Sequence, residues 1–177
     1  MAAATATLMR SSASAVVCRP VTASHVLRID GYSHLAQAMS KGERVRSSAF
    51  DVAGRRWRLQ LYPNGDDHSE LERHVAVYLR LDGYPSGERV WASPKFSLLD
   101  RLGNPGVVKD AGSPGFQKRG RFWGFPDFIS REELETPEYL KDDSVAIQCD
   151  VAVTTVRECS DHMVFISGTA EPVATEA

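Results

Sequence analysis

The chain has 177 residues, of which 42% are hydrophobic and 25% are charged, and its formal net charge is −2. This length suits one domain with a sizeable core and is short for two domains of ordinary size. The near balance of charge argues against a dedicated nucleic-acid or anionic-membrane surface, and no apolar run approaches the roughly 20 residues that a membrane-spanning helix needs. We therefore expect proteins or small molecules as partners, with no nucleic acid and no membrane.

The cysteines indicate a reducing compartment. Cys18, Cys149 and Cys159 are odd in number and form no C-x-x-C pair, so they suggest neither a disulfide framework nor a zinc knuckle. We expect a cytoplasmic or nuclear protein.

The N-terminal segment, residues 1–20, is rich in Ala, Ser and Thr, contains Arg10 and Arg19, and has no acidic residue. An acid-poor start of this kind is typical of a disordered leader or of an organelle transit peptide. Since the signal is compositional only, we favour the disordered leader and keep the transit peptide as the alternative. The folded domain is then expected over residues 21–156.

Order is expected to begin with a strand at residues 24–29, which are rich in apolar and β-branched side chains. Gly31 ends this strand, and Ser33 is expected to cap one or two helical turns. Residues 43–52 then predict a strand, in which a change of face at Ser47 fits a bulge.

The rest of the chain is organised around a strand within residues 54–65. Trp57, Leu59 and Leu61 fall on one face and polar side chains fall on the other, which is the period of two of a half-buried strand. The sequence Pro-Asn-Gly ends it, because Pro donates no ladder hydrogen bond and Asn-Gly readily adopts positive φ. Since a buried Trp brings a large apolar area, we expect the neighbouring elements to pack around Trp57.

Two further strands follow. Residues 75–82 alternate most regularly, with Val77 and Leu79 on one face and Tyr78 on the other. Residues 90–98 share a similar alternation, in which Pro94 indicates a sheet edge or a bulge. Residues 100–115 contain many Gly and Pro residues and are expected to form a loop.

The last part of the domain combines a helix and a strand. Asp127 or Ser130 is expected to cap a short helix that Pro137 ends. Residues 145–153 alternate again and predict a long strand beside or opposite the Trp57 strand.

Short strands separated by turns, with little helix, predict an all-β fold, an antiparallel β-sandwich. After this pattern fades, residues 157–177 are expected to form a tail, in which residues 163–166 offer a further short strand as the alternative.

No common catalytic or cofactor signature occurs in the chain, including the glycine-rich phosphate loops, the zinc protease helix motif and the serine hydrolase motif. The five histidines are scattered, and none lies at metal-ligand spacing from another His or a Cys. Paired acids such as Asp66-Asp67 fall in predicted loops or at a helix start, where solvation and capping explain them. We expect no catalytic residue, no metal site and no cofactor.

One local cluster, residues 117–125, is basic and then aromatic. Single-stranded nucleic acid binds to such residues through phosphate contacts and stacking, although one short cluster in a chain of negative net charge is weak support for this function. Trp123 and Phe125 are alternatively core residues that join the loop to the following helix. A third interpretation is a peptide-binding surface with exposed aromatic side chains, a close-packed glycine and Arg121.

Taken in order, these segments resemble the MATH (meprin and TRAF homology) domain, and most of all the plant proteins that carry a MATH domain ahead of a BTB/POZ domain. The resemblance covers about residues 22–153. It is carried by residues 24–33, 45–50, 57–65, 77–79, 95–100, 123–125, 128–129 and 140–147.

The resemblance implies an eight-stranded antiparallel β-sandwich, with one or two short helices, that binds short extended peptide segments of protein substrates in a shallow groove. In the MATH–BTB adaptors, the captured protein is presented to a cullin-based ubiquitin ligase, and the BTB domain contacts the cullin. Only about two dozen residues follow Val153, which leaves no room for a BTB domain of ordinary size. We therefore expect a monomer, or a partner of full-length MATH–BTB proteins that acts as a decoy.

The resemblance also implies which residues line the groove. One of them, Tyr78, is independently expected to face away from the core, because Val77 and Leu79 have the core parity. Pro94 replaces the family's aromatic residue and Phe122 replaces a polar one, so we expect a more apolar groove. The implied peptide-binding residues are Tyr78, Pro94, Arg121, Phe122, Trp123, Gly124 and Phe125.

The alternative hypothesis is an enzyme, a hydrolase that uses scattered His and Asp residues on the sandwich. His and Asp side chains that converge on a nucleophile in a closed pocket would favour that hydrolase, and a shallow open groove would favour a binding module. The nucleic-acid hypothesis predicts a steep loss of affinity with salt.

Overall fold

The computed structural model describes residues 15–67, 70, 73–83, 90–116 and 121–159. The chain divides into two compact units, one of residues 19–155 and one of residues 1–18 with 156–177. The hydrophobic core lies in the first unit.

Sheet A has the strand order β1-β10-β6-β7, and β8 also pairs with β6. Its strands are β1 (Ala15–Asp30), β6 (Val90–Leu99), β7 (Pro105–Asp110), β8 (Gly115–Phe116) and β10 (Ser144–Cys159).

Sheet B has the order β2-β4-β5-β9, and β3 also pairs with β4. Its strands are β2 (Val45–Arg46), β3 (Phe50–Val52), β4 (Arg55–Tyr62), β5 (His74–Asp82) and β9 (Phe122–Ser130). The two helices are short, and they are α1 (Tyr32–Ala38) and α2 (Arg131–Leu134).

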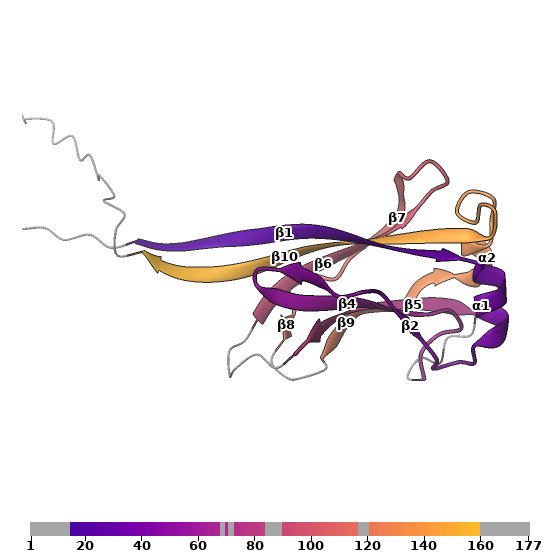
Figure 1. Ribbon diagram of the computed structural model, residues 1–177, viewed down its shortest axis with the longest axis horizontal. Helices are drawn as coiled ribbons and strands as arrows, with labels where there is room; N and C mark the ends of the chain where they lie inside the picture. The colour runs from indigo at the N-terminus through magenta and orange to yellow at the C-terminus, as the bar shows by residue number, and fades with distance from the viewer. Residues whose placement is uncertain (1–14, 68–69, 71–72, 84–89, 117–120, 160–177) are drawn as a thin grey trace, which may run out of the picture. The chain divides into compact units, whose positions relative to one another are not determined.

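The two sheets lie one over the other (Figure 1), and every pairing whose register is described is antiparallel. The predicted all-β sandwich with one or two short helices is therefore confirmed. The described residues form ten strands where the resemblance implied eight, and β2 and β8 have only two residues each. No helix among these residues is long and apolar enough to cross a membrane.

The core is centred on Trp57 of β4, as its alternation predicts. Trp57, Leu59 and Leu79 are completely buried between the sheets. The ring of Phe116 meets the indole of Trp57 edge-on, with 5.1 Å between ring centroids. The strand at residues 145–153 lies in the opposite sheet as part of β10, where its core-facing side chains include the buried Cys149.

The predicted loop at residues 100–115 is wrong in its centre, where β7 forms. Pro105 is tolerated because it is the first residue of a strand at the edge of sheet A. Gly106 is required by packing, since a Cβ atom there would lie 2.5 Å from the ring of Tyr139. Gly and Pro here permit an edge strand instead of breaking it.

The predicted cap of α1 is also wrong. Gly31 is the N-cap residue, at φ +80°, and no side chain of the cap accepts a hydrogen bond. The helix start is instead held by Asp143, whose carboxylate accepts from Ser33 N at 2.8 Å and whose carbonyl accepts from Gly31 N and Tyr32 N at 2.9 Å. A residue far away in the sequence thus satisfies the free N–H groups.

Residues 43–52 form two strands, β2 and β3, because Ser47 interrupts the ladder. Its side-chain oxygen accepts a hydrogen bond from Leu59 N at 3.0 Å, while its own N–H donates to Leu59 O at 3.0 Å. The predicted change of face at Ser47 is therefore the point at which the strand breaks.

The second helix, α2, is capped by Ser130, one of the two residues predicted for this role. Ser130 Oγ accepts from Glu133 N at 3.1 Å, and the helix ends before Pro137.

At the chain ends, β1 begins at Ala15, inside the predicted leader, and β10 continues to Cys159. The alternative short strand at residues 163–166 lies outside the described residues.

Candidate functional site

The candidate site lies on β9, the terminal strand of sheet B among the described strands. Phe122 pairs with Arg80, Trp123 with Leu79, and Gly124 with Tyr78. Because paired residues share a face of the sheet, Phe122 and Gly124 lie on the outer face with Tyr78, and Trp123 lies on the inner face at the sheet edge.

Phe122 and Trp123 are large apolar side chains that remain 40% exposed at consecutive positions of an edge strand. They present aromatic surface on the two opposite faces of that strand. We call Tyr78, Phe122, Trp123 and Gly124 the β9 site.

Tyr78 supports Phe122 from the neighbouring strand. Its ring meets those of Phe122 and Tyr62 edge-on, with centroids 5.0 and 5.7 Å apart. Its hydroxyl donates a hydrogen bond to the carboxylate of Asp66, and burial together with this bond raises the pKa of Tyr78. The ring points away from the main core, as its position predicts, yet only 7% of the residue is exposed.

Trp123 is fixed by polar contacts. Its indole Nε1 donates to the carbonyl oxygen of Ala111 at 3.1 Å, and the guanidinium of Arg121 lies 6.0 Å from its ring centroid. Trp123 therefore offers a rigid, half-covered aromatic surface, which is a good anchor for a partner.

Gly124 is necessary for the approach of β9 to β5. A Cβ atom at this position would lie 2.1 Å from the carbonyl oxygen of Val77 and 2.7 Å from Tyr78 Cα. These are backbone atoms of the paired strand, so no side-chain movement could make room. Only glycine permits this geometry between the two aromatic residues and Phe125.

Phe125 and Pro94 lie deeper than the β9 site. The ring of Phe125 packs edge-on against Phe96, with 6.0 Å between centroids, and Lys109 Nζ lies 5.4 Å from the Phe125 centroid. Pro94 is buried in sheet A and pairs with Val151 of β10. On the other side of β6 it lies in the gap between the pairings with β8 and β7, so its missing N–H breaks no pairing there.

The structure joins Pro94 to the site through one residue. Ala111 N donates to Pro94 O at 3.0 Å, and Ala111 O accepts the indole hydrogen bond of Trp123. Of the residues implied by the resemblance, the structure brings together all seven, with Pro94 and Phe125 behind the surface that the others form. Their role in binding stays a prediction.

Sequence reasoning missed the polar partners of this surface. Asp66 was placed in a solvated loop, but it is 5% exposed and accepts the Tyr78 hydroxyl. Gln60 is one of the polar side chains opposite the Trp57 face of its strand, and it does lie on the outer face, but it is 1% exposed. Alternation fixes the face of a side chain and gives no signal of what covers it.

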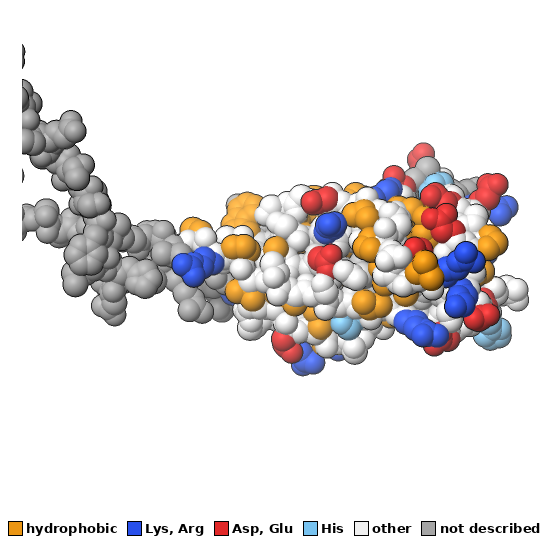
Figure 2. Space-filling view, turned by 90° about the horizontal axis from the view of Figure 1, so that it is seen from above, with side chains coloured by type: hydrophobic (Ala, Val, Ile, Leu, Met, Phe, Trp, Pro, Cys, Tyr) orange, Lys and Arg blue, Asp and Glu red, His pale blue; other side chains and the backbone are white. Residues whose placement is uncertain are grey.

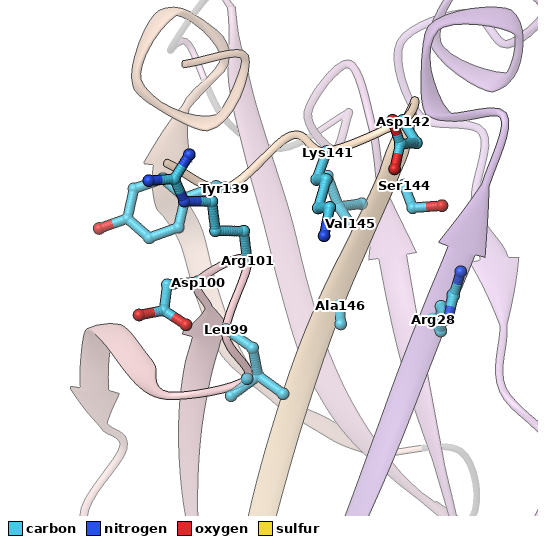
Figure 3. A pocket seen from close by; sticks show the side chains of 11 residues that line it. Arg28, Leu99, Asp100, Arg101, Tyr139, Lys141, Asp142, Ser144, Val145 and Ala146 are labelled. Carbon is cyan, nitrogen blue, oxygen red and sulfur yellow. The ribbon is translucent and has the colours of Figure 1, made fainter. Parts of the chain in front are cut away.

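A separate hollow of about 310 Å³ lies beside sheet A at the start of β10 (Figure 3). Its lining contains three basic side chains and two acidic ones, which are Arg28, Arg101, Lys141, Asp100 and Asp142. The Asp100 carboxylate accepts from the backbone N–H groups of Leu102 and Asn104 at 2.8 Å, which lowers its pKa. Asp100 therefore holds the turn that follows it, residues 101–104.

Two titratable groups outside these places, Cys149 and His25, are packed within the fold. Burial raises the pKa of the Cys149 thiol, which is typical of an unreactive cysteine. His25 stacks on Phe50 with 4.4 Å between ring centroids, and burial lowers its pKa. Within the described part of the chain, no group of three or more His, Cys, Asp or Glu residues is placed to hold a metal ion.

The sequence matches the MATH domain family over residues 24–151. The chain belongs to this family. The match spans both sheets of the domain and all residues of the β9 site.

Relatives of this MATH domain occur in Arabidopsis thaliana. BTB/POZ and MATH domain-containing protein 5 is 34% identical over 155 residues, which cover 82% of this chain and 37% of that protein. Proteins 3 and 4 of the same description are 31% and 33% identical, covering 85% and 81% of this chain and 38% and 32% of their own lengths. The chain thus spans about a third of the length of these relatives.

Proposed function

We propose that this MATH domain binds short extended peptide segments of partner proteins along the β9 edge. MATH domains are protein-interaction domains, which supports a non-catalytic role. The observation that carries the proposal is the pair of aromatic side chains, Phe122 and Trp123, each 40% exposed on an edge strand.

An extended peptide fits this edge for a geometric reason. A terminal strand offers backbone N–H and C=O groups to an added strand, and the alternate side chains of the added strand point to opposite faces. On β9, Phe122 would meet the side chains on the outer face, and Trp123 those on the inner face. Backbone hydrogen bonds then supply affinity, and the two aromatic side chains supply selectivity.

The relatives suggest a role for such binding. Their names join a MATH domain to a BTB/POZ domain, and we propose that the peptide captured here is recognised for cullin-linked ubiquitination. The alternative within this proposal is a decoy that occupies the same ligands or pairs with a MATH–BTB protein. Coprecipitation of a cullin by the 177-residue chain alone would contradict the decoy form.

The experiment is affinity selection of extended peptides from a displayed random library, followed by titration calorimetry. Trp123→Ala and Tyr78→Ala should each weaken a selected peptide by at least about tenfold, since loss of an aromatic anchor typically costs about 2 kcal/mol or more. Lys95→Gln, on the outer face of sheet A, is the matched control and should bind like wild type. Wild-type affinity in both folded aromatic variants would refute the β9 site.

Thermal unfolding of each variant separates binding from folding. Trp123 is half exposed, so Trp123→Ala is expected to remain folded. If it unfolds instead, Trp123 is a core residue, and Phe122→Ala then tests the same site from the outer face.

A further inference from the structure

The outer face of sheet B, beside the β9 site, carries more positive than negative side chains. In the strand register, Arg58 lies directly opposite Arg80, Arg46 opposite Gln60, and Arg56 opposite both Asp51 and Asp82. Like charges directly opposite each other across a sheet are unfavourable, so the Arg58–Arg80 pair indicates a purpose other than stability.

A single carboxylate serves this arginine pair. Asp82 accepts a hydrogen bond from Arg58 Nε and lies 3.8 Å from Arg80 Nε. Arg58 Nη1 also donates to Ser47 O at 3.1 Å. The two guanidinium groups are therefore held in place by one negative charge, and a net positive charge remains.

Donors without partners gather on the same face. Gln60 is 1% exposed, and its Nε2 atom has no hydrogen-bond partner among the described residues. The Nε atoms of Arg80 and Arg44 are buried and make no hydrogen bond within that part of the chain. Arg80 keeps its ion pair with Asp82, and the Arg44 guanidinium lies 5.7 Å from the ring centroid of Tyr62. An unsatisfied buried donor costs free energy, so a ligand that supplies acceptors at this face would offset part of that cost.

Nearby acids already have partners. Glu43 accepts from Ser40 N at 2.6 Å, and Asp66 accepts the Tyr78 hydroxyl. At the β2 end of this face, a hollow of about 580 Å³ is lined by Met39, Gly42, Glu43, Arg44 and Arg46.

The arginine pair is continuous with the β9 site, because Arg80 pairs with Phe122 on one side and with Arg58 on the other. The outer face of sheet A differs. Figure 2 shows that face with charged side chains of both signs interspersed, and broad areas of it are uncharged. Among the described residues, three of the four buried side-chain atoms without a hydrogen-bond partner, in Arg44, Gln60 and Arg80, belong to the sheet B face.

We propose that the peptide taken by this domain is anionic, with Asp, Glu or a phosphorylated residue placed over Arg58, Gln60 and Arg80. This inference rests on the proposed function and names the class of its ligand. Carboxylate and phosphate oxygens only accept hydrogen bonds, so they complement a surface whose unsatisfied groups are all donors. Guanidinium groups that are already fixed lose little freedom on binding such oxygens.

The experiment uses an array of octapeptides in which each position in turn is fixed as Asp, phosphoserine, Ser or Lys. The 177-residue chain should select Asp or phosphoserine over Ser at one or two positions, and Lys should be rejected there. A comparison of the Asp and phosphoserine peptides shows which anion is preferred. Arg58→Gln/Arg80→Gln should lower affinity for the anionic peptide by about tenfold and leave its Ser counterpart unchanged. Lys95→Gln should change neither.

The outcomes separate the two proposals. Binding without preference for an acid, or an anion preference that survives in a folded Arg58→Gln/Arg80→Gln variant, overturns the anionic ligand and leaves peptide binding intact. No binding of any peptide overturns the proposed function itself. If the double variant does not fold, Gln60→Leu tests the same face, because it removes an unpartnered donor, and it should reduce the preference for the anion.

Discussion

Replacement of Gly124 by Ala tests whether the close approach of β9 to β5 builds the site. The added Cβ would lie 2.1 Å from Val77 O and 2.7 Å from Tyr78 Cα. Ordinary contacts between carbon atoms are about 3.5–4.0 Å, so the strands must separate by about 1 Å or more. Overpacking of this kind costs about 1–3 kcal/mol, and the weakened ladder adds to it.

We expect Gly124→Ala to lower the free energy of unfolding by about 2–3 kcal/mol, which leaves a domain of ordinary stability folded. Urea denaturation followed by tryptophan fluorescence, to which the buried Trp57 contributes, measures this change. Peptide affinity should fall as well, because β9 is displaced.

Gly54→Ala is the control, since nothing lies within 4 Å of its added Cβ but its φ is +70°. Backbone strain alone should cost about 1 kcal/mol there. A Gly124→Ala variant that loses less than about 0.5 kcal/mol would refute the steric argument.

Three other outcomes are expected. Burial raises the pKa of Tyr32 to about 12, whereas the phenol of the unfolded chain ionises at about pH 10. The unfolded chain therefore loses this proton first, and the folded state loses stability as the pH rises from about 10 to 12. Tyr32→Phe should flatten the fall of the thermal midpoint in that pH range. The hydrogen bond from Ser33 N lowers the pKa of Asp143, so the ionised carboxylate stabilises the fold above about pH 4, and this stabilisation is lost as the pH falls further. Asp143→Asn should therefore lower the urea midpoint at about pH 7 and leave it unchanged at about pH 2. Finally, in a Cys18→Ser/Cys159→Ser variant, the buried Cys149 should react with a thiol reagent only after unfolding by urea.

The alternation of side chains predicted most of the sandwich. It placed Trp57 and Leu79 in the core, and it placed Tyr78 on the opposite face of its strand, because a strand with one buried face has a fixed period. The cap at Ser130 was also predictable, since capping depends on neighbours in the sequence.

Features that depend on distant residues were not predictable in this way. The start of α1 is held by Asp143, and Gly106 is required by the ring of Tyr139. The same holds for the site. Its aromatic cluster could be recognised in the sequence. The burial of Gln60 and the position of Arg58 directly opposite Arg80 could not, because they depend on how the strands are paired.

The central claim, that an extended peptide binds along β9, is tested most directly by an amide-resolved NMR titration with a peptide selected from the displayed library. We predict that the largest shift changes occur at Phe122, Trp123 and Phe125. New protection from hydrogen exchange is expected at the amides of Phe122 and Gly124, which point away from β5 because the neighbouring Arg121 bonds to Leu81 of that strand. Changes confined to the outer face of sheet A, or to the hollow at Asp100 and Arg101, with β9 unaffected, would contradict the account.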